Sequence, residues 1–219
     1  MIRPRVTLSF AQTLDGRVAA LDGSSQWISG PESLRFCHQL RATHAAIMVG
    51  IGTVLRDDPR LTVRLVTGRD PLRVIVDTTL RTPLTAAIIR DNAAHGTLLA
   101  CTAAAPETRR IALQRCGATI LTLPATPTGE VDLAALLAAL GERGIASVMV
   151  EGGARLLTSL LRERLADTVA ITIAPIILGA GPQAIGDVGI TTLVQAIKLR
   201  DPTWTRYGRD MVVEGLIDY

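Results

Sequence analysis

Short apolar runs alternate along this chain with longer segments of helical spacing. The runs are rich in valine, isoleucine, leucine or threonine, and most are bounded by glycine, proline or polar residues, as buried strands are. We predict strands over residues 5–10, 45–50, 72–76, 97–101, 119–123, 147–150 and 169–175.

The segments between these runs carry the start and stop signals of helices. Pro31 follows Ser29-Gly30 and is placed for a first helical turn, whereas Gly117 and Gly144 each follow a segment and would end it. The leucines of the third segment fall on one stripe. We predict helices over residues 31–41, 106–116, 131–143 and 154–163.

Alternating strands and helices favour a largely parallel sheet with helices on both faces. The C-terminal part differs, because a Gly/Pro-rich stretch over residues 179–189 precedes a strand pattern over residues 210–216. This change indicates late strands that are joined by loops and are antiparallel at the sheet edge. We therefore expect an α/β fold in a single domain over residues 1–219, without internal repeats or linkers.

Composition places the chain among soluble proteins. The hydrophobic fraction is 48%, yet no apolar stretch approaches the roughly eighteen residues of a membrane-spanning helix. The N-terminal segment lacks the apolar core and cleavage pattern of a secretory signal. Cys37, Cys101 and Cys116 are odd in number and lack paired-ligand spacing, which is typical of a reducing cytosol. We expect a cytoplasmic protein without a membrane partner.

The net charge of +3 raises the question of nucleic-acid binding. The basic residues are scattered arginines that alternate with acids, and only two Trp, two Tyr and two Phe are present for base stacking. We therefore expect no nucleic-acid partner. Scattered arginines suit the phosphate groups of a small substrate and its cofactor equally well.

The segment after the second predicted strand combines close backbone approach with charge. Gly50-Ile51-Gly52-Thr53 ends the strand, and glycines let backbone amides approach a ligand closely. Asp57-Asp58 and the flanking Arg60 and Arg64 follow within what we interpret as one short loop. This combination suits a polar, anionic small molecule better than a macromolecular surface.

Three further turns have both a functional and a structural interpretation. Glu151-Gly152-Gly153-Ala154 joins a strand to a helix, where free amides can hold a phosphate, although a tight turn needs the same glycines without a ligand. Residues 13–17 indicate a turn, and residues 77–81 either bind a phosphate or cap a loop. No glycine turn completes a G-x-G-x-x-G fingerprint, so an ordinary Rossmann site is disfavoured.

The residues of common hydrolase and metal sites do not form a pattern here. His38, His44 and His95 share no spacing, so we expect neither a catalytic histidine nor a metal ion. The sequence also contains no nucleophile elbow.

Several short blocks, taken in order, resemble a known family. They are Thr13-Leu14-Asp15-Gly16, Ser25-Gln26-Trp27-Ile28-Ser29, Leu40-Arg41-Ala42, Gly52-Thr53-Val54-Leu55, Asp57-Asp58-Pro59, Leu61-Thr62-Val63-Arg64, Val76-Asp77, Val150-Glu151-Gly152-Gly153, and Ala174-Pro175 with Leu178-Gly179. This series resembles the pyrimidine reductase of riboflavin biosynthesis, from about Arg3 to the end. The resemblance implies a dihydrofolate-reductase-like fold, NADPH as reductant, usually a homodimer, and a reductase domain without the deaminase domain that is often fused ahead of it.

The resemblance also implies a reaction. A ribosylaminopyrimidine 5′-phosphate becomes its ribitylamino form: the sugar opens to an imine at C1′, and the nicotinamide passes a hydride to that carbon. The cofactor supplies the hydride, so the protein holds the two carbons in contact and supports the proton movements. No metal is implied.

Site residues follow from the same resemblance, position by position. It implies substrate contacts at Ser25, Arg41, Leu61, Arg64 and Glu151, with both arginines on the substrate phosphate. It implies cofactor contacts at Ala11, Trp27, Thr53, Asp57, Thr78, Gly153, Ala154, Arg155, Leu156, Leu157, Thr158 and Ser159. Asp57 would be the catalytic residue, where nicotinamide and substrate meet, and would either transfer a proton or orient groups. We assign the NADPH 2′-phosphate to Thr78 and Arg81, with Arg155 as the alternative.

Departures from the family pattern leave the substrate open. Ser9 stands where many bacterial bifunctional members have lysine. Residues 48–53 look like the stand-alone type, whereas residues 25–28 look bacterial, so either the deaminated or the non-deaminated pyrimidine is reduced. Two alternatives remain. Reduction of a pterin or another small heterocycle does not require Arg41 and Arg64, and a non-catalytic nucleotide-binding module does not require an acid at Asp57.

Overall fold

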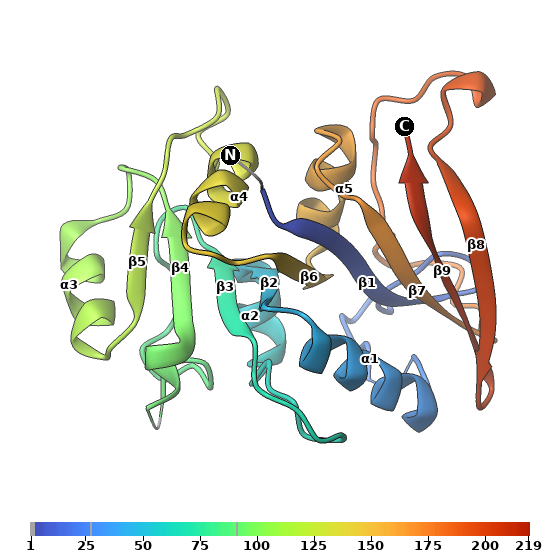
Figure 1. Cartoon of the computed structure of the whole chain (residues 1–219), viewed down its shortest axis with the longest axis horizontal. Coiled ribbons are helices and arrows are strands. Elements are labelled where there is room, and N and C mark those ends of the chain that lie inside the picture. The colour runs from blue at the N-terminus through green and yellow to red at the C-terminus, as the bar shows by residue number, and fades with distance from the viewer. Residues whose placement is uncertain (1–2, 27, 91) are drawn as a thin grey trace.

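One sheet of nine strands organises the molecule, in the order β5-β4-β3-β2-β6-β1-β7-β9-β8 (Figure 1). The structure is a computed structural model, and it describes residues 3–26, 28–90 and 92–219. The strands are β1 (Arg5–Thr13), β2 (Ala46–Gly50), β3 (Leu72–Val76), β4 (Thr97–Cys101), β5 (Thr119–Thr122), β6 (Ser147–Gly152), β7 (Thr168–Ala174), β8 (Lys198–Tyr207) and β9 (Asp210–Asp218). Strands β1 to β7 are parallel, and β9 and β8 close the edge as antiparallel strands, which confirms the predicted sheet.

Helices cover both faces of this sheet, also as predicted. The helices are α1 (Pro31–Thr43), α2 (Ile51–Asp57), α3 (Glu107–Arg115), α4 (Leu133–Glu142) and α5 (Ala154–Arg162), with short 3₁₀ turns η1 (Ala93–Gly96) and η2 (Leu193–Gln195). Alternate residues of a strand point to opposite faces. Met48 therefore belongs to the same core cluster as Leu136 of α4 and Leu157 of α5, whereas Ile47 belongs with Val54 of α2 to a second cluster on the other face.

The start of α1 is held by the far end of the chain. Gly30 precedes the helix and has no side chain that could cap it, and Pro31 occupies the first turn. The buried carboxylate of Asp210, at the start of β9, accepts a hydrogen bond of 2.7 Å from the Gly30 N–H. An acid at a helix N-terminus also complements the helix dipole. This contact fixes α1 against the antiparallel edge of the sheet.

Two elements differ from the sequence prediction. The expected loop after Gly50 is wrong, because residues 51–57 form α2 and Asp57 is its last residue. Burial of Ile51 and Val54 stabilises this short helix despite Gly52, so tertiary packing overrides propensity. Strand β8 was not predicted. Its side chains are mostly exposed and its pairing with β9 is interrupted after Arg200, so it lacks the apolar alternation of a half-buried strand.

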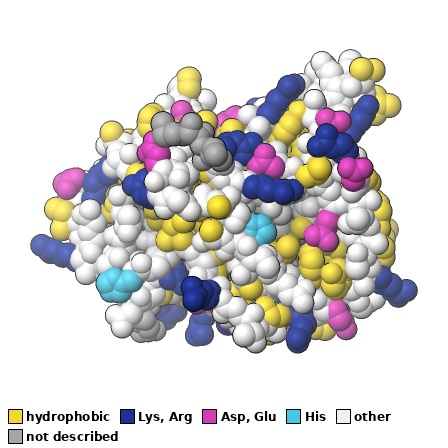
Figure 2. Space-filling model, in the orientation of Figure 1, with side chains coloured by type: hydrophobic (Ala, Val, Ile, Leu, Met, Phe, Trp, Pro, Cys, Tyr) yellow, Lys and Arg dark blue, Asp and Glu magenta, His cyan; other side chains and the backbone are white. Residues whose placement is uncertain are grey.

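The surface carries charges of both signs. Figure 2 shows dark blue and magenta side chains interspersed over one face rather than separated into two regions. Among the described residues, no helix is long and apolar enough to cross a membrane.

Candidate active site

A crevice for a ligand is expected where β2 and β6 lie side by side. Both strands end at the same edge of the sheet, and the helices that follow them diverge. Helix α2 packs on one face and α5 on the other. In parallel α/β sheets, ligands bind at such switch points, outside the carboxyl ends of the strands.

The two glycine turns at this point touch each other. Gly153 has a φ of +89°, and a Cβ added to it would lie 3.6 Å from the Gly50 nitrogen. A Cβ added to Gly152 would lie 3.4 Å from Oγ1 of Thr53. The prediction that a strand leads through a glycine pair into a helix at residues 150–154 is therefore confirmed. This turn lies against the start of α2.

The first turn of α5 has backbone N–H groups that lack intrahelical acceptors. Its N-cap, Gly153, supplies no side-chain hydrogen bond, and the first N–H of the helix with an intrahelical acceptor is that of Leu157, 3.0 Å from the Gly153 oxygen. The N–H groups of Ala154, Arg155 and Leu156 therefore precede the intrahelical ladder. Together with the helix dipole, they form a site suited to a phosphate.

Four side chains of residues 153–159 have contacts within the protein: those of Arg155, Leu156, Leu157 and Thr158. Leu156 and Leu157 are buried in the core. The Thr158 hydroxyl donates to the Ala154 oxygen at 2.6 Å and accepts the Gly186 N–H at 2.9 Å. Arg155 is exposed and pairs with Glu130. A phosphate at this turn would therefore be held by the backbone of the first helical turn rather than by these side chains.

A bulge in β6 sets the direction of Glu151. Met48 pairs with Val150 and Val49 pairs with Gly152, so Glu151 is the extra residue between them. Its carboxylate binds the Arg41 guanidinium of α1 through two hydrogen bonds of 2.5 Å each. The Arg41 side chain is only 10% exposed and the Glu151 side chain only 11%. Two residues predicted to contact the substrate thus form a bidentate ion pair with each other.

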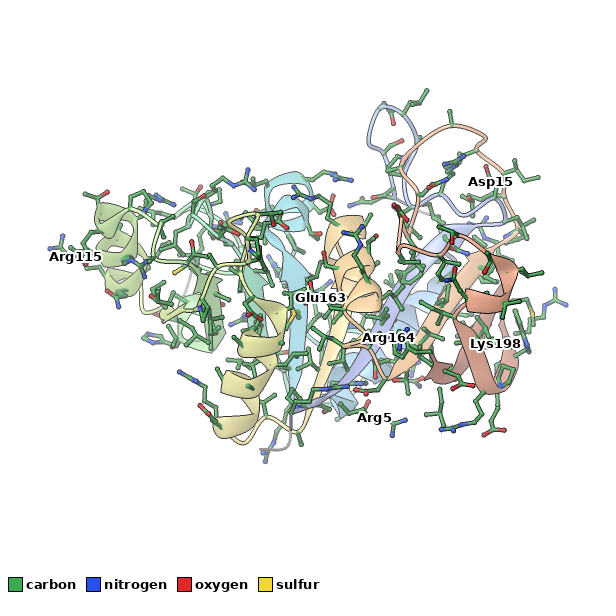
Figure 3. All side chains as sticks on the ribbon, turned by 90° about the horizontal axis from the view of Figure 1, so that it is seen from above. Arg5, Asp15, Arg115, Glu163, Arg164 and Lys198 are labelled. Carbon is green, nitrogen blue, oxygen red and sulfur yellow. The ribbon has the colours of Figure 1, made fainter. Side chains whose placement is uncertain are left out.

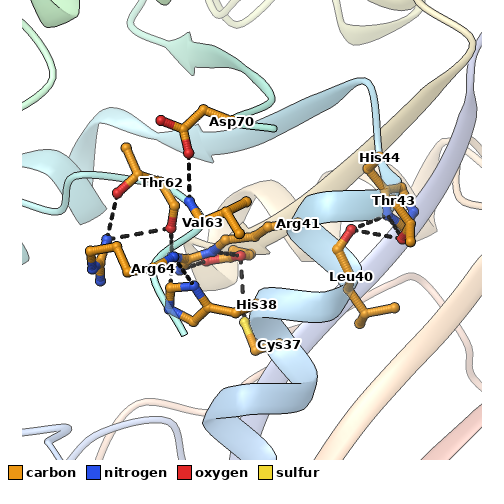
Figure 4. Close-up of polar contacts among 11 residues, drawn as sticks. Cys37, His38, Leu40, Arg41, Thr43, His44, Thr62, Val63, Arg64 and Asp70 are labelled. Carbon is orange, nitrogen blue, oxygen red and sulfur yellow. Dashed lines mark hydrogen bonds and ion pairs between the residues drawn. The ribbon is translucent and has the colours of Figure 1, made fainter. Parts of the chain in front are cut away.

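A polar cluster surrounds this pair (Figure 4). The Nη1 of Arg41 donates to the Thr62 oxygen at 2.9 Å, and the Arg64 N–H donates to Nδ1 of His38 at 2.9 Å. The Cys37 thiol lies 3.5 Å from the Glu151 carboxylate. Cys37, His38 and Arg41 lie on one side of α1, because residues three and four apart are neighbours on a helix.

Burial determines the charges in the cluster. It lowers the pKa of His38 to about 4, assisted by the Arg41 and Arg64 guanidiniums and opposed by Glu151. Burial also raises the pKa of the Cys37 thiol. For Arg41, burial is the largest cause and lowers the pKa, but the hydrogen bonds and charge of Glu151, with smaller contributions from Cys37 and Asp70, together outweigh it and the net pKa is raised. At neutral pH the cluster therefore contains a charged arginine, a neutral imidazole and a neutral thiol.

Arg64 has a different environment from Arg41. It is exposed, and its guanidinium bonds the hydroxyl of Thr62 at 2.8 Å. Within the described residues it forms no ion pair. The segment leading to it begins at Leu61, which is buried and has a φ of +53°, in the left-handed region. Arg64 is thus the predicted phosphate ligand that has no carboxylate partner.

Asp57 lies one helical turn beyond Thr53, on the same side of α2. Thr53 is beside Gly152, so the two side chains extend from the glycine turn along the helix. Desolvation raises the pKa of Asp57, and the neighbouring Arg56 opposes it. A raised pKa is common for carboxylates that exchange protons, although ordinary surface acids can share it.

The remaining predicted cofactor and substrate positions lie on several elements. Ala11 and Ser25 are half-buried, in β1 and in the loop before α1. Thr78 follows β3, and its oxygen accepts the Thr102 N–H at 3.1 Å. Trp27 lies outside the described residues.

The buried carboxylate of Asp77 accepts the N–H groups of Arg81 and Thr82 at 2.9 and 2.8 Å, so it caps the loop after β3. The Arg81 guanidinium is exposed and has no hydrogen bond or ion pair within the described part of the chain. The Arg81 guanidinium is therefore available to bind a phosphate. The position of Asp77 is explained by its capping of the loop and needs no ligand.

The turn over residues 13–17 joins two loops. Asp15 lies among the loops at the edge of the molecule (Figure 3). It accepts N–H bonds from Leu178 and Gly179 at 3.1 and 2.6 Å and a bond from the Thr13 hydroxyl at 2.6 Å. The Thr13 hydroxyl and the two backbone amides lower the pKa of Asp15 to about 2. The predicted turn is present, and its acid fixes the loop after β7. Among the described residues, no group of three or more His, Cys, Asp or Glu side chains could hold a metal ion.

Sheet order, diverging helices and an open glycine turn define the class of protein: a largely parallel α/β domain whose glycine turn at the switch point has a geometry suited to a phosphate. The profile of the RibD C-terminal domain matches residues 4–213. The chain therefore belongs to the RibD C-terminal domain family, which confirms the resemblance to the pyrimidine reductases of riboflavin biosynthesis.

Individual relatives agree with this assignment. The chain is 40% identical over 218 residues to the 2,5-diamino-6-ribosylamino-4(3H)-pyrimidinone 5′-phosphate reductase of Methanothermobacter thermautotrophicus, covering 97% of this chain and 98% of that protein. It is 40% identical over 212 residues to the riboflavin biosynthesis protein RibD of Aquifex aeolicus, covering 96% of this chain but 57% of that protein.

A solved structure shows the same fold. The riboflavin biosynthesis reductase Rib7 of Saccharomyces cerevisiae superposes with a TM-score of 0.75 at 29% identity, covering 100% of this chain and 91% of that chain. The predicted dihydrofolate-reductase-like fold is confirmed by this likeness.

Proposed function

We propose that this chain reduces a ribosylaminopyrimidine 5′-phosphate to its ribitylamino form in riboflavin biosynthesis, with NADPH as reductant. Relatives named as this reductase support the proposal. The observation that carries it is the end of β6, where Glu151 binds Arg41 of α1 and the next two residues open the N-terminus of α5. The residues that we assign to a polar substrate and to cofactor phosphates are thus neighbours along one strand.

The glycine turn supports NADPH as the cofactor, and when bound the nicotinamide supplies a hydride to C1′ of the substrate. The amides of Ala154, Arg155 and Leu156 would hold cofactor phosphates, because the glycine before them leaves the approach free of a side chain. Thr53 and Asp57 would face the reacting groups along α2, and Arg81 would bind the 2′-phosphate. Holding the two reacting carbons in contact is the main contribution of these residues.

Substrate binding is assigned to the polar cluster. Arg64 would bind the substrate phosphate directly, because its guanidinium is exposed and forms no ion pair with a carboxylate of the described residues. The Arg41–Glu151 pair would contact the sugar or pyrimidine, together with Ser25 and Leu61. Asp57 would supply or orient the proton that accompanies the hydride, consistent with its raised pKa.

Assembly and location complete the proposal. A homodimer is supported by the exposed edge strand β8, which presents Trp204 at 58% exposure, and by Leu193 and Val194 of η2 at 89% and 90%. The three cysteines are free, which is consistent with a reducing cytoplasm.

The activity is tested by NADPH oxidation with the deaminated and the non-deaminated ribosylaminopyrimidine phosphates side by side. We expect turnover of at least one, and the ratio of catalytic efficiencies decides which precursor is used. Turnover of a pterin, with neither pyrimidine reduced, would contradict the proposal.

The cofactor site is tested at Gly153, with Gly144 as a matched control. Both glycines have positive φ values next to a helix end, +89° and +75°, so alanine strains both by about 1–3 kcal/mol. Only Gly153→Ala should also weaken NADPH binding, measured by fluorescence titration, because only Gly153 adjoins the amides of α5. Equal NADPH affinity in the two folded variants would argue against a phosphate at this turn.

A further inference from the structure

The segment that carries Arg64 is fastened at three points (Figure 4). The Thr62 oxygen accepts a bond from Arg41, the Val63 N–H donates to Asp70 at 2.7 Å, and the Arg64 N–H donates to His38 at 2.9 Å. Of the three partners, Arg41, Asp70 and His38, it is His38 that bonds the backbone of Arg64 itself. The segment starts with Leu61 at a φ of +53°, a conformation that persists only where the surroundings impose it.

The bond fixes the chemical state of His38. Because Nδ1 accepts an N–H, it carries no proton, so the neutral ring has its proton on Nε2. The ring is 1% exposed, and Nε2 lies 3.5 Å from the Arg41 guanidinium. A protonated ring would be a donor at both nitrogens and could not accept the Arg64 N–H.

We propose that His38 is a positioning residue of the reductase: its Nδ1 fixes the backbone of Arg64 and thereby aims that guanidinium at the substrate phosphate. The inference rests on the proposed function, in which Arg64 binds this phosphate. Neither the resemblance nor the histidine spacing assigns a role to His38, which acts only through Arg64 and touches no reacting atom.

The neighbours of His38 keep the ring neutral over the physiological range. Arg41 faces it from α1, Arg64 from the loop, and Glu151 from β6, so two cations and one anion surround a buried imidazole. Burial and the cations hold its pKa at about 4. As the pH falls towards 4, the ring gains a proton on Nδ1, and the bond to Arg64 is lost.

The test compares His38→Leu with His38→Asn. Leucine removes the acceptor, whereas the asparagine oxygen can accept the same N–H and does not titrate. We expect His38→Leu to raise KM for the phosphorylated substrate about fivefold, the effect of one neutral hydrogen bond, with little change in kcat or NADPH affinity. His38→Asn should restore KM, and its KM should not rise as the pH falls towards 4, in contrast to the wild type.

His44→Leu is the matched control. His44 also lies at α1 and is hydrogen-bonded, to the Leu40 oxygen at 2.7 Å and to the Thr7 hydroxyl at 3.0 Å, but it does not contact the Arg64 segment. Its loss should lower the thermal midpoint without changing KM. If His44→Leu raises KM as much as His38→Leu, helix stability rather than the contact with Arg64 is responsible, and the proposal is overturned.

Hydrogen exchange separates this proposal from the proposed function. In ligand-free protein, the Arg64 amide should exchange faster in His38→Leu and remain protected in His38→Asn and His44→Leu. Unchanged exchange in His38→Leu would overturn the positioning role. Failure of the wild type to reduce any ribosylaminopyrimidine phosphate would instead overturn the proposed function and, with it, the role of His38 in that reaction, even if exchange shows the bond.

Discussion

Arg41 and Arg64 have the same side chain and the same expected ligand, yet the fold places them in opposite environments. Arg41 is 10% exposed and gives two hydrogen bonds to the Glu151 carboxylate. The Arg64 guanidinium is exposed and, among the described residues, bonds only oxygens of Thr62. A guanidinium neutralised inside the protein mainly holds elements together, whereas an exposed one remains available to a ligand.

The difference has an energetic side. A phosphate that binds Arg41 must compete with Glu151 for donors that are already committed, and an ion pair already removed from water has little to gain from another anion. At Arg64 the phosphate replaces water and a hydroxyl. We therefore expect Arg64 to carry most of the phosphate affinity and Arg41 most of the stability.

The largest effect is expected from breaking the buried pair. Arg41→Met should lower the free energy of unfolding by about 3 kcal/mol, because it leaves the Glu151 carboxylate buried without its cationic partner. Urea unfolding measures the loss. The double variant Arg41→Met/Glu151→Gln should recover part of it, and a loss below about 1 kcal/mol would show that the pair behaves as a surface contact.

The second prediction is a loss of activity that leaves the stability of the protein unchanged. Arg64→Lys retains the charge but loses the planar fork, so kcat/KM for the phosphorylated substrate should fall about tenfold or more. Stability and NADPH binding should be unchanged. Arg69→Lys, at an exposed position of the same loop, is the control. An equal loss with a substrate lacking the phosphate would make Arg64 structural and favour a pterin.

A third prediction concerns the imidazole between the two arginines. The unfolded chain binds a proton on His38 near the ordinary value of 6.5, whereas the folded protein binds it only near pH 4. Stability is therefore fully present above about pH 6.5 and is lost as the pH falls from there towards 4. The denaturant midpoint should fall less steeply with decreasing pH over this range in His38→Asn than in the wild type. Identical slopes would show that other groups cause the acid sensitivity.

The smallest effect extends the comparison to a second pair of arginines. Arg155 pairs with Glu130, whereas the Arg81 guanidinium has no hydrogen bond or ion pair among the described residues. Arg81→Ala should narrow the preference for NADPH over NADH by about fivefold, and Arg155→Ala should leave it unchanged. The ratio of kcat/KM values for the two cofactors measures this. The reverse pattern would assign the 2′-phosphate to Arg155.

Much of the scaffold could be predicted because local patterns and burial agree. Runs such as residues 72–76 and 97–101 are mostly apolar and are preceded by Pro71 and Gly96, and their observed bounds match. Helix α2 was missed because Gly50 precedes it, Gly52 lies within its first turn, and its stability comes from packing. Strand β8 was missed because an exposed edge strand needs no apolar alternation.

The site was predictable as a set of residue types but not as an arrangement. Arg41 and Glu151 are distant in sequence, and the bulge that turns Glu151 towards α1 has no local signature. His38 was set aside because the three histidines share no spacing. The usable signal was its position three residues before Arg41, on the same side of a helix. Local spacing could have placed His38 next to Arg41, but only the fold places its Nδ1 against the backbone N–H of Arg64.

The position of β6 between β1 and β2 also constrains how the chain is made. The first two strands to leave the ribosome face each other across a gap that residues 147–152 fill. Until those residues emerge, each strand exposes an unpaired edge, which is a site for wrong pairing between chains. Folding of the centre of the sheet therefore waits for most of synthesis, and chains arrested before Ser147 should aggregate rather than persist as partial domains.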